Sequence, residues 1–321
     1  MIALGNNACR AVSVGDAACT GVYVGDAMVF PDAPTYDETK IAVIWLENDE
    51  PTETIEYFDT LSDARSYMYS QYAADRRFWV RLGKQLPTMQ EFTSRYFSTF
   101  PCVRKFTAYS GIDILPSNAF EGSPNLKEVY TNGAGFVFED ANENLVLSEG
   151  VFNNCQSLEK IEIVGTTSYL NSKAALNSSW IGYTSQLPKL KTVDFSIPTY
   201  GVFNFAYPVL ETFTMRKLYS KNADLDVSNG GKVGNEAFKG CTTLRNVDIS
   251  ATDALYVLGE AFAGCTALEN VSLSYDVSQG GEIASDAFTG CDGVTITINA
   301  PENSISGAPW GATNAEIIWT G

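Results

Sequence analysis

Hydrophobic positions recur along most of the chain in a fixed order, in which a small residue and a phenylalanine precede a leucine and then an alternating apolar pair. One clear copy contains Ala237 and Phe238, then Leu244, and then Val247 and Ile249. The alternation places Val247 and Ile249 on one face of a short strand, with the polar residue between them on the other face. The stretch around Phe238 is too short for an independent helix, so we expect one turn packed on the strand layer.

This unit repeats at a regular interval. Phe238, Phe262 and Phe288 follow one another after 24 and 26 residues, which is a repeat period. Two upstream copies contain Phe120 and Phe152. One unit cannot bury its apolar side alone, so stacked copies should form a continuous core with phenylalanine over phenylalanine and leucine over leucine. The pattern predicts an α/β solenoid.

Four of the seven cysteines share one position in the unit, three residues after the phenylalanine: Cys155, Cys241, Cys265 and Cys291. We interpret them as small, reduced, apolar groups that form a file inside the solenoid. The chain has no C-x-x-C pair and no histidine. A zinc site would therefore need cysteines from separate coils.

At these residues the chain resembles the BspA-like branch of the leucine-rich repeat family, whose unit reads approximately I-x-x-x-A-F-x-G/N-C-x-x-L-x-x-V-x-L. The similarity covers roughly Leu86 to Ile298, with weaker units at Val103, at Leu190 and at Leu210. It implies a curved, β-lined, right-handed coil of about eight or nine turns. Such a coil serves in binding, and the resemblance does not name the ligand.

Residues 1–35 have a different pattern, of short strands and a linker. Two stretches around Val14 and Val24 alternate apolar and small residues before Gly-Asp turns. Three short strands bury little surface alone, so we expect this β-rich segment to attach to a larger partner or to sister chains. The candidate attachment residues are Val22, Tyr23, Val24, Val29 and Phe30. The alternative is a disordered leader.

Residues 36–85 predict a small α/β module that caps the first coil. Its strands are expected over residues 41–46, 54–58 and 78–82. A helix is expected from Leu61 to Ala74, with Asp59 or Thr60 as its N-cap.

The solenoid itself is expected over residues 86–300, and a capping strand over residues 301–321. In that last segment Ile317 and Trp319 alternate as a strand, and Trp310 is placed to cover the last coil.

Two intervals between the unit leucines are 32 residues rather than 24. The additional residues lie at 132–144 and 165–186, and insertions in a solenoid form loops on one rim. Aromatic residues gather in and after the second insertion, as a binding rim would show. The candidate rim residues are Tyr169, Trp180, Tyr183 and Tyr200. The alternative is that such residues pack the insertion onto the coil, which suits Phe203 and Phe205 better.

The chain is strongly acidic, with 21 Lys and Arg against 38 Asp and Glu and a net charge of −17. Such a surface repels phosphate backbones and anionic membranes, so nucleic acid and lipid are poor candidate partners. The start at Met1 lacks a secretory signal pattern, and no later segment is apolar enough to span a bilayer. We therefore expect synthesis and folding in a cytoplasm.

Little in the sequence supports catalysis. The absence of histidine excludes Ser-His-Asp and Cys-His nucleophiles, and no glycine-rich phosphate motif occurs. Acidic loops at Asp140 and Asp224 lack the glycine and the glutamate that an EF-hand requires. Two interpretations of these loops stay open: a calcium site of looser geometry, or a polar turn without a bound ion. Two carboxylates could still run a glycosidase. We expect no enzyme, no cofactor and no metal.

Both ends of the chain are similar to short modules of bacteriophage tail and fibre proteins of gut bacteria, at Val22–Pro31 and Gly307–Trp319. This resemblance implies a virion protein whose N-terminus anchors to other virion proteins or sister chains. Its repeats would then be displayed to a host-surface protein or glycan. The alternative is a BspA-like adhesin on a bacterial cell surface, and a third hypothesis is a carbohydrate-active enzyme.

Overall fold

The computed structural model describes most of the chain from residue 35 onward. Backbone and side chains are described for residues 35–72, 76–87, 89, 91–112, 115–132, 150–164, 187–196, 207–216, 232–251, 254–276, 278–302 and 304–321. Backbone alone is described for residues 3–4, 7–10, 23–24, 27–28, 137–139, 145–147, 176–177, 199–200, 202–204, 217–219 and 277. The chain divides into two compact units, residues 1–38 and residues 39–321.

The first unit contains four short strands: β1 (Ala3–Leu4), β2 (Asn7–Arg10), β3 (Tyr23–Val24) and β4 (Ala27–Met28). They pair in that order as an antiparallel sheet. Only β3 coincides with an expected strand, because the other three lack a clear alternation of apolar and polar residues. The strands expected around Val14 and Phe30 lie outside the described residues.

The second unit begins with a small α/β cap. Its elements are β5 (Ile41–Glu47), β6 (Glu50–Phe58), α1 (Leu61–Ser70) and β7 (Arg77–Leu82). Strands β6, β5 and β7 pair antiparallel, and β7 pairs parallel with the first strand of the repeats, β8 (Val103–Ala108). The cap therefore extends the sheet of the solenoid.

Two bounds in the cap differ from expectation. Strand β6 begins at Glu50 because Asn48 and Asp49 both adopt positive φ, 53° and 69°, and make a tight hairpin. Helix α1 ends at Ser70, where Gln71 is the C-cap. The N-cap is Thr60, as one of the two expected residues, and its hydroxyl accepts from the amide of Asp63.

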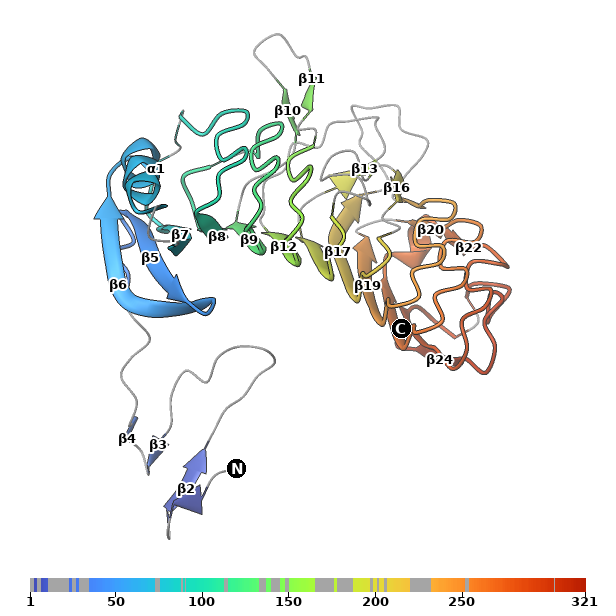
Figure 1. Ribbon diagram of the computed structural model, residues 1–321. Coiled ribbons are helices and arrows are strands. Elements are labelled where there is room, and N and C mark those ends of the chain that lie inside the picture. The colour runs from blue at the N-terminus through green and yellow to red at the C-terminus, as the bar shows by residue number, and fades with distance from the viewer. Residues whose placement is uncertain are drawn as a thin grey trace. The chain divides into compact units, whose positions relative to one another are not determined.

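One long sheet connects the coils. Beyond β8 its strands are β9 (Glu128–Asn132), β12 (Lys160–Val164), β14 (Thr192–Ser196), β17 (Thr212–Tyr219), β19 (Asn246–Ala251), β21 (Asn270–Ser274), β23 (Thr295–Asn299) and β24 (Glu316–Trp319). Neighbours in this series are parallel. Figure 1 shows these strands along the inner side of an arc, with the turns of the coils on its outer side. The expected unit of one turn and one strand is thus repeated in coil after coil.

A second, smaller parallel sheet was not expected from the sequence. It consists of β13 (Leu176–Asn177), β16 (Val202–Asn204), β18 (Lys232–Val233), β20 (Leu255–Val257) and β22 (Gly281–Ile283). Each strand is only two or three residues long, too short to produce a detectable alternation. Its apolar members Val233, Val257 and Ile283 are buried in the core.

The remaining elements lie in the connections. The first insertion contains an antiparallel pair, β10 (Val137–Glu139) and β11 (Leu145–Leu147). Strand β15 (Thr199–Tyr200) pairs with β17, and a 3₁₀ turn spans Val277–Gln279. No helix in the described part of the chain is both long enough and apolar enough to cross a membrane.

Stacked phenylalanine rings form the centre of the coils. Ring centroids lie 5.1 Å apart between Phe238 and Phe262 and 4.9 Å apart between Phe262 and Phe288, with nearly parallel planes. A second file contains Phe97, Phe120 and Phe152, at 5.6 and 5.5 Å. These side chains are fully buried. Each ring is therefore covered by neighbouring rings or, at the end of a file, by other side chains.

Buried hydroxyl and thiol groups fasten one coil to the next. The Cys265 and Cys291 thiols donate to the carbonyl oxygens of Phe238 and Phe262, at 3.1 and 3.2 Å. Ser123, which stands where other units have cysteine, donates in the same way to Phe97 at 2.6 Å. Burial raises the pKa of the Cys241 thiol to about 12, so the protonated donor form persists at neutral pH.

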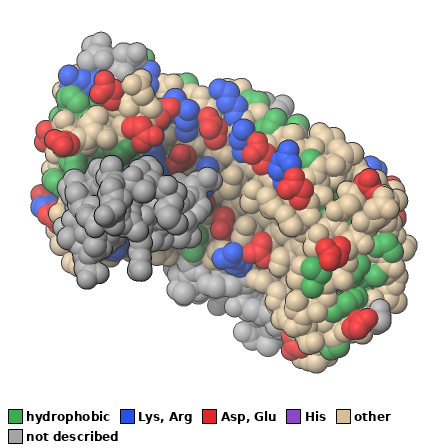
Figure 2. All heavy atoms as spheres, turned by 90° about the horizontal axis from the view of Figure 1, so that it is seen from below, with side chains coloured by type: hydrophobic (Ala, Val, Ile, Leu, Met, Phe, Trp, Pro, Cys, Tyr) green, Lys and Arg blue, Asp and Glu red, His purple; other side chains and the backbone are tan. Residues whose placement is uncertain are grey.

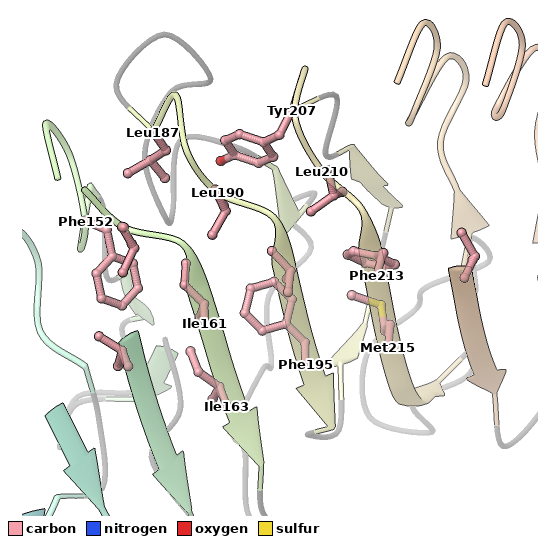
Figure 3. Packing of buried hydrophobic residues seen from close by; sticks show 14 of the residues in the cluster. Phe152, Ile161, Ile163, Leu187, Leu190, Phe195, Tyr207, Leu210, Phe213 and Met215 are labelled. Carbon is pink, nitrogen blue, oxygen red and sulfur yellow. The ribbon is translucent and has the colours of Figure 1, made fainter. Parts of the chain in front are cut away.

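Two coils lack a phenylalanine at the usual position and fill the space differently. Leu187 and Tyr207 stand where other units have cysteine, and both are fully buried. Figure 3 shows both of them above the strand residues Phe195 and Phe213. Larger residues at the cysteine position thus keep the core continuous where the regular pattern lapses.

We expect Phe262→Ala to lower the free energy of unfolding by about 3–5 kcal/mol, because it removes a ring packed between two others and leaves a cavity. Urea titration followed by circular dichroism measures this change. Lys239→Ala is the control, since Lys239 is exposed and pairs only with Glu236 and Glu260, and it should be close to neutral. Small and equal effects of the two substitutions would contradict the assignment of inside and outside.

Candidate functional site

The inner face of the long sheet presents two rows of side chains, one position per strand in each row. Row one consists of Trp79, Lys105, Glu128, Lys160, Thr192, Thr212, Asn246, Asn270 and Thr295. Row two consists of Arg81, Thr107, Tyr130, Glu162, Asp194, Thr214, Asp248, Ser272 and Thr297. Neither row contains an aliphatic side chain. The strand residues between them, such as Val247 and Ile249, point into the core.

The first strands of this face enclose a hollow of about 220 Å³, here called the aromatic groove. It is lined by Trp79, Lys105, Thr107, Tyr109, Glu128, Val129, Tyr130, Lys160 and Glu162. The Trp79 indole N–H donates to the Thr107 hydroxyl at 2.9 Å. The Tyr109 and Tyr130 rings lie 5.4 Å apart. These contacts fix the orientation of the aromatic side chains.

Charged groups surround the aromatic groove in balanced pairs. Lys105 forms an ion pair with Glu128 at 2.8 Å, and Lys160 pairs with Glu162 at 3.1 Å. The Lys105 ammonium also lies 5.0 Å from the centre of the Trp79 ring, a favourable cation–π distance. The groove therefore offers ammonium donors and carboxylate acceptors side by side, without a net charge from these four groups.

A second hollow, of about 360 Å³, lies over β17, β19, β21 and β23 and is here called the polar groove. Its lining residues are Thr212, Phe213, Thr214, Asn246, Val247, Asp248, Asn270, Val271, Ser272 and Thr297. The Asn270 amide donates to the Asn246 side-chain oxygen at 3.0 Å. Arg216 pairs with Asp248 at 2.9 Å. Hydroxyl and amide groups thus dominate this part of the face.

Charged residues at the beginning of the strands form a line along one edge of the face, alternating in sign from Lys127 onward, and they are visible as blue and red side chains in Figure 2. Its members are Arg104, Lys127, Glu159, Lys191, Glu211, Arg245 and Glu269. Lys127 pairs with Glu159 at 3.6 Å and Lys191 with Glu211 at 2.9 Å. Asp49 of the cap hairpin joins Arg104 and Lys127, and these two cations hold the pKa of Asp49 below its usual range.

Two carboxylates are adjacent in row two, because Glu162 and Asp194 lie opposite each other on β12 and β14. Burial raises the pKa of Asp194, the hydrogen bond from Ser196 opposes that rise, and the charge of Glu162 adds to it. Glu162 and Asp194 thus bring two carboxyl groups next to each other on the face. Among the described residues, no group of three or more His, Cys, Asp or Glu side chains is arranged to hold a metal ion.

The structure places the residues proposed from the sequence in different ways. Tyr169, Trp180 and Tyr183 of the proposed rim lie outside the described residues, and Tyr200 is described only as backbone of β15. The proposed core residues form the files described above: Phe120, Phe152, Phe238, Phe262, Phe288, Cys155, Cys241, Cys265 and Cys291. Of the proposed attachment residues, Tyr23 and Val24 form β3, whereas Val22, Val29 and Phe30 are not described. The acidic loops at 140–144 and 224–228 also lie outside the described residues.

The two rows of the inner face were missed from the sequence. Their members are the polar residues of the alternating V-x-I stretches, such as Asp248 between Val247 and Ile249. That alternation was a usable signal, because it already places these residues on the face opposite the core. The alternation alone does not show which residues of neighbouring coils lie side by side.

Comparison with known proteins identifies the repeat. Six copies of the BspA type leucine-rich repeat region match residues 84–197 and 221–309. A crystal structure of a leucine-rich repeat protein from Bacteroides ovatus ATCC 8483 is similar at 14% identity, over 74% of this chain and 72% of that chain, with a TM-score of 0.27. No curated protein matches the chain.

We expect Asp194→Asn to stabilise the protein at neutral pH. The pKa of Asp194 is raised in the folded state, so the ionised side chain opposes folding above that pKa, and this cost disappears as the pH falls below the unfolded value. The asparagine side chain keeps an oxygen that can accept the hydrogen bond from the Ser196 hydroxyl. Thermal unfolding between pH 4 and pH 8 should show a gain in Tm that grows with pH.

A gain that is independent of pH would contradict this account. Asp248→Asn is the matched control, because Asp248 is paired with Arg216 and its loss should give no such gain.

Proposed function

Because this chain belongs to the BspA-type leucine-rich repeat family, we propose that it is a non-enzymatic binding protein whose ligand lies on the inner face of the long sheet. The observation that carries this proposal is the pair of continuous rows, which contain no aliphatic residue and over which two grooves lie. A face that only covered a core would not need an aligned set of hydrogen-bonding groups from cap to last coil. Such a set is suited to an elongated ligand.

The arrangement of the carboxylates supports binding rather than hydrolysis. Glu128, Glu162 and Asp248 each form an ion pair with a lysine or arginine, so these carboxylates are already engaged within the face. The neighbours Glu162 and Asp194 keep a carbohydrate-active enzyme as the competing hypothesis, because two carboxylates can cleave a glycosidic bond. Release of reducing sugar from a polysaccharide would favour that hypothesis.

We place this binding face on a bacteriophage particle, with the N-terminal unit as the anchor to other virion proteins or sister chains and the repeats facing a host cell. Support comes from the separate compact unit at residues 1–38 and from the similarity of the two chain ends to phage modules. The same binding face also suits an adhesin on a bacterial cell surface. Host-surface proteins and glycans are the proposed partners in both settings.

The binding face can be tested by filling the polar groove. Thr214→Arg combined with Ser272→Arg places two large cations in row two, and we expect binding to bacterial cells to fall by about tenfold or more. The matched control is Thr242→Arg with Thr266→Arg, on exposed turns outside the sheet. Flow cytometry of a labelled protein on a panel of gut bacteria measures the effect.

Equal binding by both double variants would show that the ligand binds outside the inner face of the sheet. The rim residues Trp180 and Tyr183 would then be the next location to test, by substitution with alanine. Undiminished binding after those substitutions as well would contradict a role for the repeats.

The anchor can be tested by deletion of residues 1–31. The solenoid from residue 39 onward has its own stacked core, so we expect a soluble, cooperatively folding chain that no longer assembles on particles or with sister chains. Sedimentation velocity and incorporation into particles give the two readouts. Incorporation as efficient as that of the full chain would place the anchor elsewhere.

A further inference from the structure

We propose that the ligand of the inner face is a neutral polysaccharide, with one sugar ring in the aromatic groove and the rest of the chain along rows one and two. This proposal rests on the binding role proposed above and specifies the chemical class of the ligand. It is carried by three features of the face: the absence of aliphatic residues from rows one and two, the aromatic end and the balanced charge.

The lack of aliphatic groups separates a saccharide from a peptide. Protein interfaces bury apolar anchors in matching apolar pockets at their centre. Rows one and two offer none from β7 to β23, and in the described part of the sheet the first exposed aliphatic residue in line with row two is Ile318 on β24. In Figure 2, much of the surface that is not grey is coloured neither as hydrophobic nor as charged. A ligand covered with hydroxyl groups can satisfy such a face, because each hydroxyl both donates and accepts.

The polar groove provides the hydrogen bonds that a chain of sugars requires. Asn246 and Asn270 present amides on neighbouring strands and are linked at 3.0 Å. Thr212, Thr214 and Ser272 add hydroxyls around them. Since parallel strands are about 4.8 Å apart, equivalent groups recur at an even spacing, which suits a polymer of repeated units better than a compact ligand.

The aromatic groove provides a place for a ring. Each sugar ring has a face of C–H groups that packs on an aromatic side chain, and Trp79 and Tyr130 both line the hollow. The indole is held by its bond to Thr107 and the tyrosine by its contact with Tyr109. Because these orientations exist before binding, little side-chain entropy is lost when a ligand arrives.

The charges favour a neutral sugar over an acidic one. Lys105 pairs with Glu128, and Lys160 pairs with Glu162. A carboxylate or sulfate on the ligand would therefore be attracted by the lysine of a pair and repelled by its glutamate. The whole chain carries a net charge of −17, which adds a repulsion for polyanions. Hydroxyl groups can instead bridge the ammonium and carboxylate of each half-exposed pair.

Isothermal titration of the full chain with defined hexasaccharides tests the proposal. The neutral probes are cellohexaose, maltohexaose, mannohexaose and chitohexaose. The charged probes are the acidic hexasaccharide hexagalacturonate and, as a peptide for comparison, hexaglutamate. We expect at least one neutral probe to bind and both charged probes to bind more weakly. Failure of every neutral probe, or preference for a charged one, would overturn the proposal.

Paired variants locate the bound ring. Trp79→Ala and Tyr130→Ala should each weaken binding of the neutral probe by about tenfold or more, because each removes an aromatic platform. Trp79→Phe and Tyr130→Phe keep a ring and should retain most of the affinity. Equal loss in the alanine and phenylalanine variants would overturn the ring-stacking assignment, and circular dichroism confirms that each variant is folded.

The cell-binding assay keeps this proposal distinct from the proposed function. Loss of cell binding in Thr214→Arg with Ser272→Arg, together with no binding of any neutral probe, would reject the polysaccharide and retain the binding face. Unchanged cell binding in that double variant would reject the face itself, and the polysaccharide proposal with it.

Discussion

The peptide groups of Phe97, Phe120, Phe238 and Phe262 are each held by the next coil through both the amide and the carbonyl, and the alignment of the coils depends on these bonds. The Phe262 amide donates to the Ala287 carbonyl at 2.7 Å, and the Phe262 carbonyl accepts from the Cys291 thiol at 3.2 Å. The same pair of bonds joins Phe238 to Ala261 and Cys265. A buried peptide group without partners would be costly, so these bonds fix how far one coil may slide along the next.

This alignment produces the functional surface. When the coils are in register, the polar residues of successive strands fall into two straight rows, and slippage by one residue would turn them toward the core. The charges along the edge of the face favour the same register, since a shift would separate the opposite charges that pair between neighbouring coils. The insertions at 132–144 and 165–186 leave the register of β9, β12 and β14 intact. The face therefore continues past both of them.

Much of the fold could be predicted from residues that repeat, and the remainder depends on groups that do not. The file of Phe238, Phe262 and Phe288 and the strand after each follow directly from spacing and alternation. The hairpin at Asn48 and Asp49 was missed because its charged, proline-containing stretch looks like a linker, although two successive positive φ angles make it a turn. The second sheet was missed because its strands are too short to show a period.

The inner face illustrates a different limit. Thr212, Asn246 and Asn270 are separated by tens of residues and carry no catalytic or metal-binding chemistry, so none of them attracts notice alone. They become a site only when coil stacking brings them side by side at strand spacing. The aromatic residues of the second insertion were conspicuous in the sequence for the opposite reason, since three of them lie close together in a stretch without repeat pattern.

Carboxyl footprinting of the protein bound to the cells it recognises tests most directly whether the inner face is the ligand surface. A carbodiimide labels exposed carboxylates, and mass spectrometry measures the extent of labelling at each glutamate. Glu128 and Glu162 on the face are compared with Glu236 and Glu260 on turns outside the sheet. The side chains of all four are solvent-accessible in the free protein. We predict that labelling of the first two falls on binding while that of the second two is unchanged. Protection of Glu236 and Glu260 alone, or of neither pair, would contradict the account.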